Sequence, residues 1–206
     1  MLRFYRTPTF LKKMFPDWIW NIPSNDREIF LTFDDGPVPG PTDYVLEQLA
    51  RVEAKATFFC IGDNIRKHPE TYKRILDAGH RIGNHTYNHL SGWSNGATAY
   101  VDNVKKCGSL ISSNGKPLFR PPYGKINPFA LRALDDYTIV MWDLLSYDFD
   151  KKINAKVVLH DMIRLTRPGS VVVFHDSYKA EKNLRLLLPA YLDFLVKDHF
   201  KLKSIT

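Results

Sequence analysis

Short apolar runs alternate with amphipathic segments along most of this chain of 206 residues. Runs rich in β-branched and aromatic residues predict strands at residues 29–33, 56–60, 80–84, 117–120, 137–142, 170–174 and 200–205. Apolar residues at helical spacing predict helices at about 42–52, 69–78, 98–112, 128–135, 155–165 and 183–197. Pro189 should kink or restart the last of these helices.

This alternation predicts an α/β fold in a single domain, a distorted and shortened (β/α)7 barrel of the TIM type. A full eight-fold barrel typically takes about 250 residues, more than this chain has. An open doubly wound sheet is the alternative, but the first strand–helix turn lacks the glycine pattern that binds phosphate in that fold. Residues 1–27 precede the pattern, and we expect them to be a lead-in segment packed onto a domain of residues 28–206.

Composition excludes few functions. The formal net charge of +7 would suit an anionic partner, but without a long Lys/Arg run or a nucleic-acid-binding motif we expect no nucleic acid.

No apolar run approaches the ~20 residues of a transmembrane helix, and no secretory signal is recognisable. We therefore expect a cytoplasmic protein, with export by another route left open. The basic and aromatic residues 1–15 would suit peripheral contact with a membrane, and the oligomeric state is not indicated.

Polar side chains follow most of the predicted strands. The carboxyl ends of the strands of a barrel meet at one face, where active sites of such folds lie. Residues that would gather there are Asp34, Asp35, His85, His89, Arg120, Tyr123, Asp148, His175 and Asp176. Each of them alone has an ordinary structural interpretation. Together they are much harder to explain by chance.

These residue types predict a metal-assisted hydrolase. His85 and His89 with one carboxylate would make a three-ligand divalent site with an open position, provided that the chain turns helically after Asn84. Because neighbours on a strand diverge, only one of the two adjacent aspartates can be the third ligand, and the other could accept a proton from water. Arg120 could keep that second carboxylate ionised, and His175 could act as an acid. The same ligand set also occurs in non-haem iron oxygenases.

The chain resembles the polysaccharide deacetylase family, the NodB-homology domain or carbohydrate esterase family 4, over about residues 28–206. Five motifs carry the resemblance, in order: Thr32-Phe33-Asp34-Asp35-Gly36, His85-Thr86-Tyr87-Asn88-His89, Arg120-Pro121-Pro122-Tyr123-Gly124, the region 142–149, and Val173-Phe174-His175-Asp176. The resemblance implies that Asp35, His85 and His89 bind a divalent metal, zinc above all, with cobalt or nickel as alternatives. It also implies that Asp34 is the general base and that Arg120 steadies it.

The remaining roles come from the same resemblance. His175 would be the general acid, and Asp148 would tune it. The Tyr123 amide would help to hold the oxyanion. Val173 would line the pocket for the acetyl methyl group. The fourth motif departs from the usual form, which has an aspartate at the position of Leu145 and a tryptophan at that of Phe149.

The implied activity is removal of acetyl groups from N-acetylated amino sugars in peptidoglycan- or chitin-type glycans or their precursors. A water molecule activated by the metal would attack the acetyl carbonyl. The alternatives are hydrolysis of O-acetyl esters on an acetylated polysaccharide and a non-enzymatic glycan-binding protein. The retention of both Asp34 and His175 argues against the last of these.

Overall fold

One parallel sheet runs through the molecule. The computed structural model describes residues 3–112 and 115–206. The sheet has the order β5-β4-β3-β2-β1-β7-β6, and β8 pairs with β1 outside this path. The strands are β1 (Glu28–Asp34), β2 (Thr57–Cys60), β3 (Arg81–Asn84), β4 (Leu118–Phe119), β5 (Thr138–Ile139), β6 (Leu144–Leu145), β7 (Val171–His175) and β8 (Lys201–Lys203).

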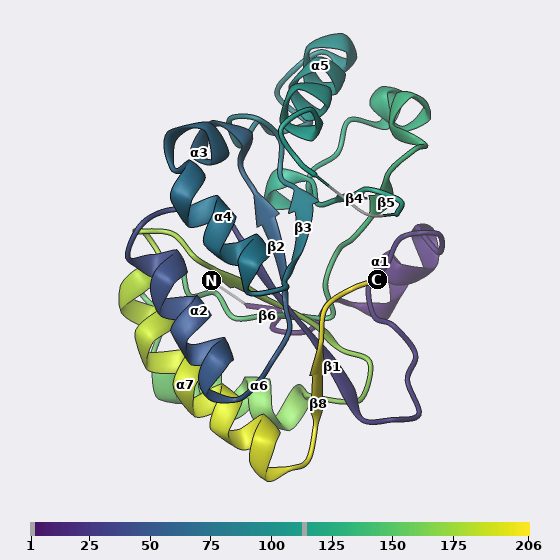
Figure 1. The fold of residues 1–206 in the computed structure, drawn as a ribbon. Coiled ribbons are helices and arrows are strands. Elements are labelled where there is room, and N and C mark those ends of the chain that lie inside the picture. Colours follow the sequence, from purple (N-terminus) through teal and green to yellow (C-terminus); the bar gives the residue numbers. More distant parts are fainter. Residues whose placement is uncertain (1–2, 113–114) are drawn as a thin grey trace.

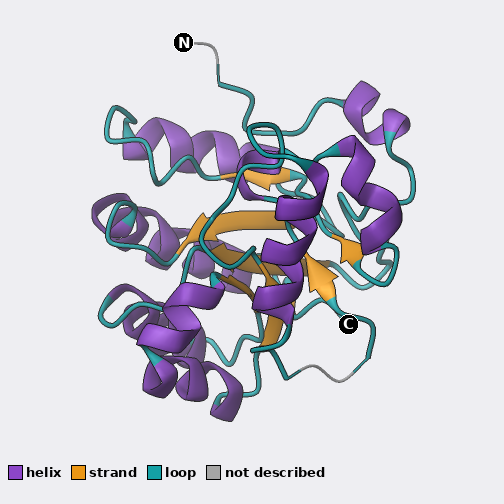
Figure 2. Ribbon diagram, turned by 90° about the horizontal axis from the view of Figure 1, so that it is seen from above, coloured by secondary structure: helices purple, strands orange, loops and turns teal. Residues whose placement is uncertain are grey.

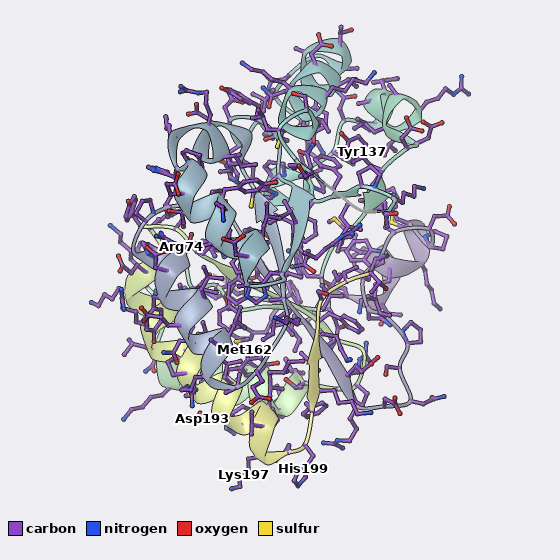
Figure 3. All side chains as sticks on the ribbon, in the orientation of Figure 1. Arg74, Tyr137, Met162, Asp193, Lys197 and His199 are labelled. Atoms are coloured by element: carbon purple, nitrogen blue, oxygen red, sulfur yellow. The ribbon has the colours of Figure 1, made fainter. Side chains whose placement is uncertain are left out.

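Helices surround these strands (Figures 1 and 2). They are α1 (Thr9–Met14), α2 (Pro41–Arg51), α3 (Gly62–Lys67), α4 (Pro69–Asp77), α5 (Ala97–Gly108), α6 (Ala155–Leu165) and α7 (Glu181–Lys197), with short 3-10 helices at η1 (Pro122–Gly124) and η2 (Pro128–Leu134). Figure 3 shows Asp193 and Lys197 at the periphery of α7, whereas Met162 of α6 is fully buried. None of the helices within the described residues has the length and apolar content needed to cross a lipid bilayer.

The central strand β1 is buried on both faces. Its odd-numbered residues Ile29, Leu31 and Phe33 belong to the large apolar core that also contains residues of α2, α6 and α7. Its even-numbered residues point the other way, because successive side chains of a strand alternate. Asp34 therefore shares the barrel-interior face with Thr32, and both side chains are buried.

The N-terminal segment closes the barrel. Strands β5 and β6 lie at opposite ends of the sheet order, although only residues 140–143 separate them in the chain, so the sheet must curl until its two edges approach each other. Ile19 pairs with the backbone around Val140, and Tyr5 O accepts a hydrogen bond of 2.9 Å from Leu145 N. Ile22 N donates to Gly169 O, at 2.8 Å. The segment thus fills the seam between the two edges.

The predicted fold class is confirmed, with local corrections. Each of the seven predicted strands has a counterpart, but the predicted strand 137–142 shortens to β5, and β6 was not predicted. The short helix α3 was missed too, since its sequence Gly-Asp-Asn-Ile-Arg-Lys has only one apolar residue to reveal a periodicity. Of the two predicted effects of Pro189, the restart is wrong, because α7 runs from Glu181 to Lys197 as one helix with Pro189 inside it, and the kink stays a prediction. The boundary between residues 27 and 28 stays a prediction.

Candidate active site

The strand β1 ends in a buried ion pair. Asp34 is 4% exposed, and its Oδ1 accepts a hydrogen bond of 2.7 Å from Nη1 of Arg120. Arg120 is fully buried, and it also donates to Thr32 Oγ1 at 2.8 Å and to the carbonyls of residues 140 and 141 at 3.1 and 2.8 Å. Burial lowers the pKa of Arg120, whereas the charge of Asp34 raises it. These bonds hold the Asp34 carboxylate in one place.

Asp35 turns away from Asp34. Its φ of 82° lies in the left-handed region, and its side chain points at two histidines. Asp35 Oδ1 is 3.3 Å from His89 Nε2 and 3.7 Å from His85 Nε2. This oxygen is buried and has no hydrogen-bond partner within residues 3–112 and 115–206. A buried carboxylate oxygen without a donor is costly, so its position calls for a cation.

The two histidines converge without a helix. Asn84 and the residues after it form a loop in which Thr86 and His89 have φ values of 64° and 60°. Asn84 Oδ1 accepts a hydrogen bond from Thr86 N, and Thr86 Oγ1 accepts one from Leu90 N, at 2.8 and 2.9 Å. The expected helical turn after Asn84 is therefore wrong. Two left-handed residues and side chains that bond the backbone bring the imidazoles together instead.

Each imidazole is oriented through its Nδ1 atom. His85 Nδ1 is 2.8 Å from Arg120 O, and His89 Nδ1 is 3.1 Å from the hydroxyl of Tyr123. Both Nε2 atoms are thus free to face Asp35. Burial lowers the pKa of His85 to about 3, with a smaller contribution from His89, and burial also lowers the pKa of His89. Both rings are therefore neutral at neutral pH, as a metal ligand must be.

The residues present fit a divalent metal. One ligand atom from each of Asp35, His85 and His89 lies within 4.8 Å of the others. Two imidazole nitrogens and one carboxylate oxygen form a donor set that leaves an open coordination position. The unpartnered Oδ1 of Asp35 is the atom that an ion would satisfy.

A second histidine–carboxylate pair lies on the neighbouring strand. His175, the last residue of β7, is the register partner of Asp34. Its Nδ1 is 2.7 Å from Oδ1 of the fully buried Asp148, whose Oδ2 accepts the His175 amide at 2.8 Å. Burial by itself would lower the pKa of His175, but the charge and hydrogen bond of Asp148 outweigh it and raise the pKa to about 9. His175 is therefore protonated at neutral pH.

These groups face a common cavity of about 260 Å³. It is lined by Asp34, Asp35, His85, His89, Pro121, Tyr123, Trp142, Leu145, Phe149, Val173, His175 and Lys179. The structure thus brings together the sequence-predicted site residues, with Arg120 and Asp148 directly behind the lining. Both departures in the fourth motif, Leu145 and Phe149, lie on the cavity wall. Tyr123 has a φ of 59°, and its amide makes no hydrogen bond to the described part of the chain.

Two supporting residues received no role from the sequence. Asp176 is fully buried and accepts hydrogen bonds from Gly36 N at 3.1 Å and Thr42 Oγ1 at 2.6 Å. Burial raises its pKa to about 8. A Cβ at Gly36 would lie 2.0 Å from Asp176 Oδ2, so the turn after Asp35 requires glycine. Asn64 of the unpredicted α3 donates to Asp35 O at 2.7 Å. The sequence placed Asp176 at the end of the last motif without giving it a role, and it gave no signal for Asn64.

Comparison with known proteins identifies the family. Residues 21–142 match the family model of polysaccharide deacetylases. A peptidoglycan-N-acetylglucosamine deacetylase of Bacillus cereus is 31% identical over 193 residues, which cover 91% of this chain and 90% of that protein. A chitooligosaccharide deacetylase of Azorhizobium caulinodans is 32% identical over 162 residues, 76% of this chain and 77% of that protein.

The fold agrees with these relatives. The solved structure of a peptidoglycan N-acetylglucosamine deacetylase in complex with 4-naphthalen-1-yl-N-oxidanyl-benzamide has a TM-score of 0.85 at 29% identity, and the match covers 97% of this chain and 95% of that one. The chain therefore belongs to the polysaccharide deacetylase family, that of NodB homology and carbohydrate esterase family 4, and is a hydrolase of that family.

Proposed function

We propose that this protein hydrolyses the N-acetyl group of an amino sugar in a glycan or a glycan precursor. The observation that carries the proposal is that two buried carboxylate pairs, Asp34 with Arg120 and Asp148 with His175, stand beside a three-residue ligand set at one cavity. Hydrolysis of an amide needs a base for the attacking water and an acid for the leaving amine. The relatives named above act on peptidoglycan and on chitooligosaccharides, which makes these glycan types the first candidates.

Asp35, His85 and His89 would hold a divalent metal, with zinc as the first candidate and cobalt or nickel as alternatives. A bound ion would supply Lewis-acid chemistry, since it polarises a carbonyl and makes water more acidic. The chain's own contribution is to present one carboxylate oxygen and two neutral imidazoles to it. Because Asp35 faces the two imidazoles and Asp34 is paired with Arg120, the two adjacent aspartates would take separate tasks.

Asp34 would accept the proton of the attacking water. Its hydrogen bond with Arg120 holds the carboxylate in place at the cavity that contains the ligand set. The four hydrogen bonds of Arg120 to Thr32, Asp34 and two backbone carbonyls leave it no freedom to release Asp34. We assign Arg120 a positioning role for this reason.

His175 would protonate the departing amine. With Nδ1 bound to Asp148, Nε2 is the ring atom left for the substrate, and a pKa near 9 keeps the proton on the ring until the C–N bond breaks. The Tyr123 amide, free of other partners among the described residues, would donate to the developing oxyanion. Val173 lines the cavity beside His175 and would contact the acetyl methyl group.

Mass spectrometry of a panel of oligosaccharides tests the proposal. We expect each productive N-acetylated oligomer to lose the mass of one acetyl group, replaced by hydrogen, and to yield free acetate. O-acetylated, N-unsubstituted oligomers measure the ester alternative in parallel. Asp34→Asn serves as the inactive control, and its circular dichroism spectrum must match the parent. Release of acetate from O-acetyl substrates alone would replace the amide by the ester as the target bond.

A further inference from the structure

A second and larger cavity lies beside the catalytic one. This groove has a volume of about 760 Å³, within the range of about 300–1,000 Å³ that is usual for ligand sites. Tyr123, Trp142 and Leu145 line both spaces, so that the groove begins where the catalytic cavity ends. A ligand in the catalytic cavity could therefore extend into the groove.

The N-terminal segment builds one wall of the groove. The residues that this segment contributes are Phe4, Thr7, Pro8, Phe10, Leu11, Phe15, Trp18 and Trp20. The opposite wall comes from Trp93 and from residues of the stretches 123–131 and 141–147. Nearly every side chain on both walls is aromatic or aliphatic.

Three polar side chains of the groove donate to backbone carbonyls. Thr7 Oγ1 donates to Trp142 O at 2.8 Å, and the hydroxyl of Tyr147 donates to Phe4 O at 3.3 Å. Trp20 Nε1 donates to a backbone carbonyl at 3.0 Å. A sugar ring needs hydrogen-bond partners for its hydroxyls, and a groove lined mainly by aromatic and aliphatic side chains, with three of its polar groups bonded to the backbone, offers few of them. Its walls fit a hydrocarbon chain instead.

Charge and exposure agree with this conclusion. Lys125 is the only charged residue lining the groove within the described residues, and its ammonium lies 4.9 Å from the centre of the Trp93 ring. Phe4, Phe10 and Trp93 are 59%, 62% and 69% exposed. Exposed apolar side chains gathered around one depression are typical of a binding surface.

We propose that this groove binds the hydrocarbon tail of an amphiphilic substrate, an acetylated amino sugar with a covalently attached aliphatic chain. The sugar then occupies the adjoining catalytic cavity. This inference rests on the proposed function for the sugar part and on the groove itself for the tail. A lipid bilayer would contact a protruding surface, whereas the groove is concave and continuous with the catalytic cavity. Continuity with that cavity also favours a tail over a second copy of the chain.

Alkyl glycosides of an N-acetylated chitin disaccharide test the tail directly. Methyl, butyl, octyl and dodecyl glycosides are compared below their critical micelle concentrations, with acetate release as the readout. We expect KM to fall by about fourfold per methylene over the first part of the series, the gain that corresponds to burying a methylene group, and kcat to change little. A KM that is independent of tail length, with activity retained, overturns the proposal.

Exposed aromatic residues inside and outside the groove provide a test variant and a control. Phe10 lines the groove at 62% exposure, whereas Phe129 is 88% exposed and does not line it. In the parent protein the dodecyl tail should lower KM relative to the methyl glycoside. Phe10→Ala combined with Trp93→Ala should reduce this ratio of KM values at least about tenfold, because two exposed aromatic contacts are lost. Phe129→Ala should leave that ratio unchanged. Equal losses in both variants would contradict a tail bound in the groove.

A binding experiment separates this inference from the proposed activity. Dodecyl maltoside carries no acetyl group, and its binding below the critical micelle concentration is measured by calorimetry. Binding that Phe10→Ala/Trp93→Ala weakens and Phe129→Ala does not supports the groove even if no substrate is deacetylated. If dodecyl maltoside does not bind, the proposal is overturned. Phospholipid vesicle binding or dimerisation that Phe10→Ala/Trp93→Ala abolishes would then assign the groove to a bilayer or to a second copy of the chain.

Discussion

The two sides of the catalytic cavity differ in whether their carboxylates have partners within the chain. On one side Oδ1 of Asp34 and Oδ1 of Asp148 each bind a side-chain nitrogen, that of Arg120 or of His175, at 2.7 Å in both cases. On the other side Asp35 keeps a buried oxygen without a hydrogen-bond donor among the described residues, and two neutral imidazoles point at it. The first side has its partners within the chain, and the second side would take the proposed cation as its partner.

The backbone explains the difference. Asp34 and His175 are the last residues of adjacent paired strands, so the sheet register alone sets their separation. Asp35, Thr86 and His89 have positive φ values, outside regular structure. Such conformations cost about 1–3 kcal/mol each and persist where the surroundings enforce them. The strand ends thus serve the proposed proton transfers, and the strained loops serve the proposed metal.

The largest effect is expected from the side of the proposed metal ligands. His85→Ala combined with His89→Ala should abolish metal binding and reduce activity below detection, because two of three proposed ligands are gone. Metal content by mass spectrometry and acetate release measure both effects. His160→Ala, an exposed histidine on α6, is the control and should change neither. Full metal occupancy in the double variant would disprove the ligand assignment.

The two adjacent aspartates should then behave differently. Asp34→Asn should keep the metal and lose about 10²–10⁴ in kcat, the usual contribution of a general base. It should also lower the free energy of unfolding by about 3–5 kcal/mol, because Arg120 is left buried without its counter-ion.

Asp35→Asn should cost little stability, since its Oδ1 accepts no hydrogen bond from the described residues, but it should weaken metal binding. Urea denaturation and metal titration of the two variants give the comparison. If Asp34→Asn loses the metal and Asp35→Asn keeps it, the assignments of general base and metal ligand must be exchanged between the two residues.

His175→Ala should separate two classes of substrate. An amine leaves a tetrahedral intermediate poorly unless it is protonated, so cleavage of an N-acetyl sugar should fall by about 10²–10⁴. A nitrophenyl acetate has a good leaving group, and its hydrolysis should suffer far less. Steady-state rates on both substrates at equal metal content provide the measurement. Equal losses on the two would assign His175 to substrate positioning.

Asp148→Asn should give the smallest effect, visible mainly in the pH profile. The raised pKa of His175, about 9, keeps the acid protonated at neutral pH, and kcat/KM should decline as the pH rises through about 9. Without the Asp148 charge this pKa falls, so the decline should begin at lower pH, with about tenfold lost per pH unit above the new pKa. An unchanged alkaline limb would show that another group controls it.

The sequence predicted most of the scaffold because apolar runs mark buried strands. The run Ile29–Phe33 and the carboxylates after it sufficed to place Asp34 at the carboxyl end of β1. Similar reasoning placed His175 at the carboxyl end of β7. The resemblance to a family then separated Asp34 from Asp35, which residue type alone could not do. The individual roles of these residues stay predictions until they are measured.

What the sequence missed depends on contacts that are distant along the chain. The two-residue strand β6 exists because it pairs with β7, and Leu144-Leu145 alone shows no strand pattern. The convergence of His89 on Asp35 depends on a left-handed backbone that side chains of Asn84 and Thr86 support. The groove depends on the N-terminal segment lying against residues 123–147, a tertiary contact with no local signal.

The seam that the N-terminal segment fills has a consequence for synthesis in the cell. Thr7 bonds Trp142, which lies 135 residues later in the chain, so the segment leaves the ribosome long before its partners do. Until then Phe10, Trp18 and Trp20 have no wall to pack against, and exposed apolar segments of this kind promote aggregation. Long-range contacts also form late, since loop closure costs entropy that only the finished contact offsets. Barrel closure and groove formation should therefore coincide, as the last step of folding.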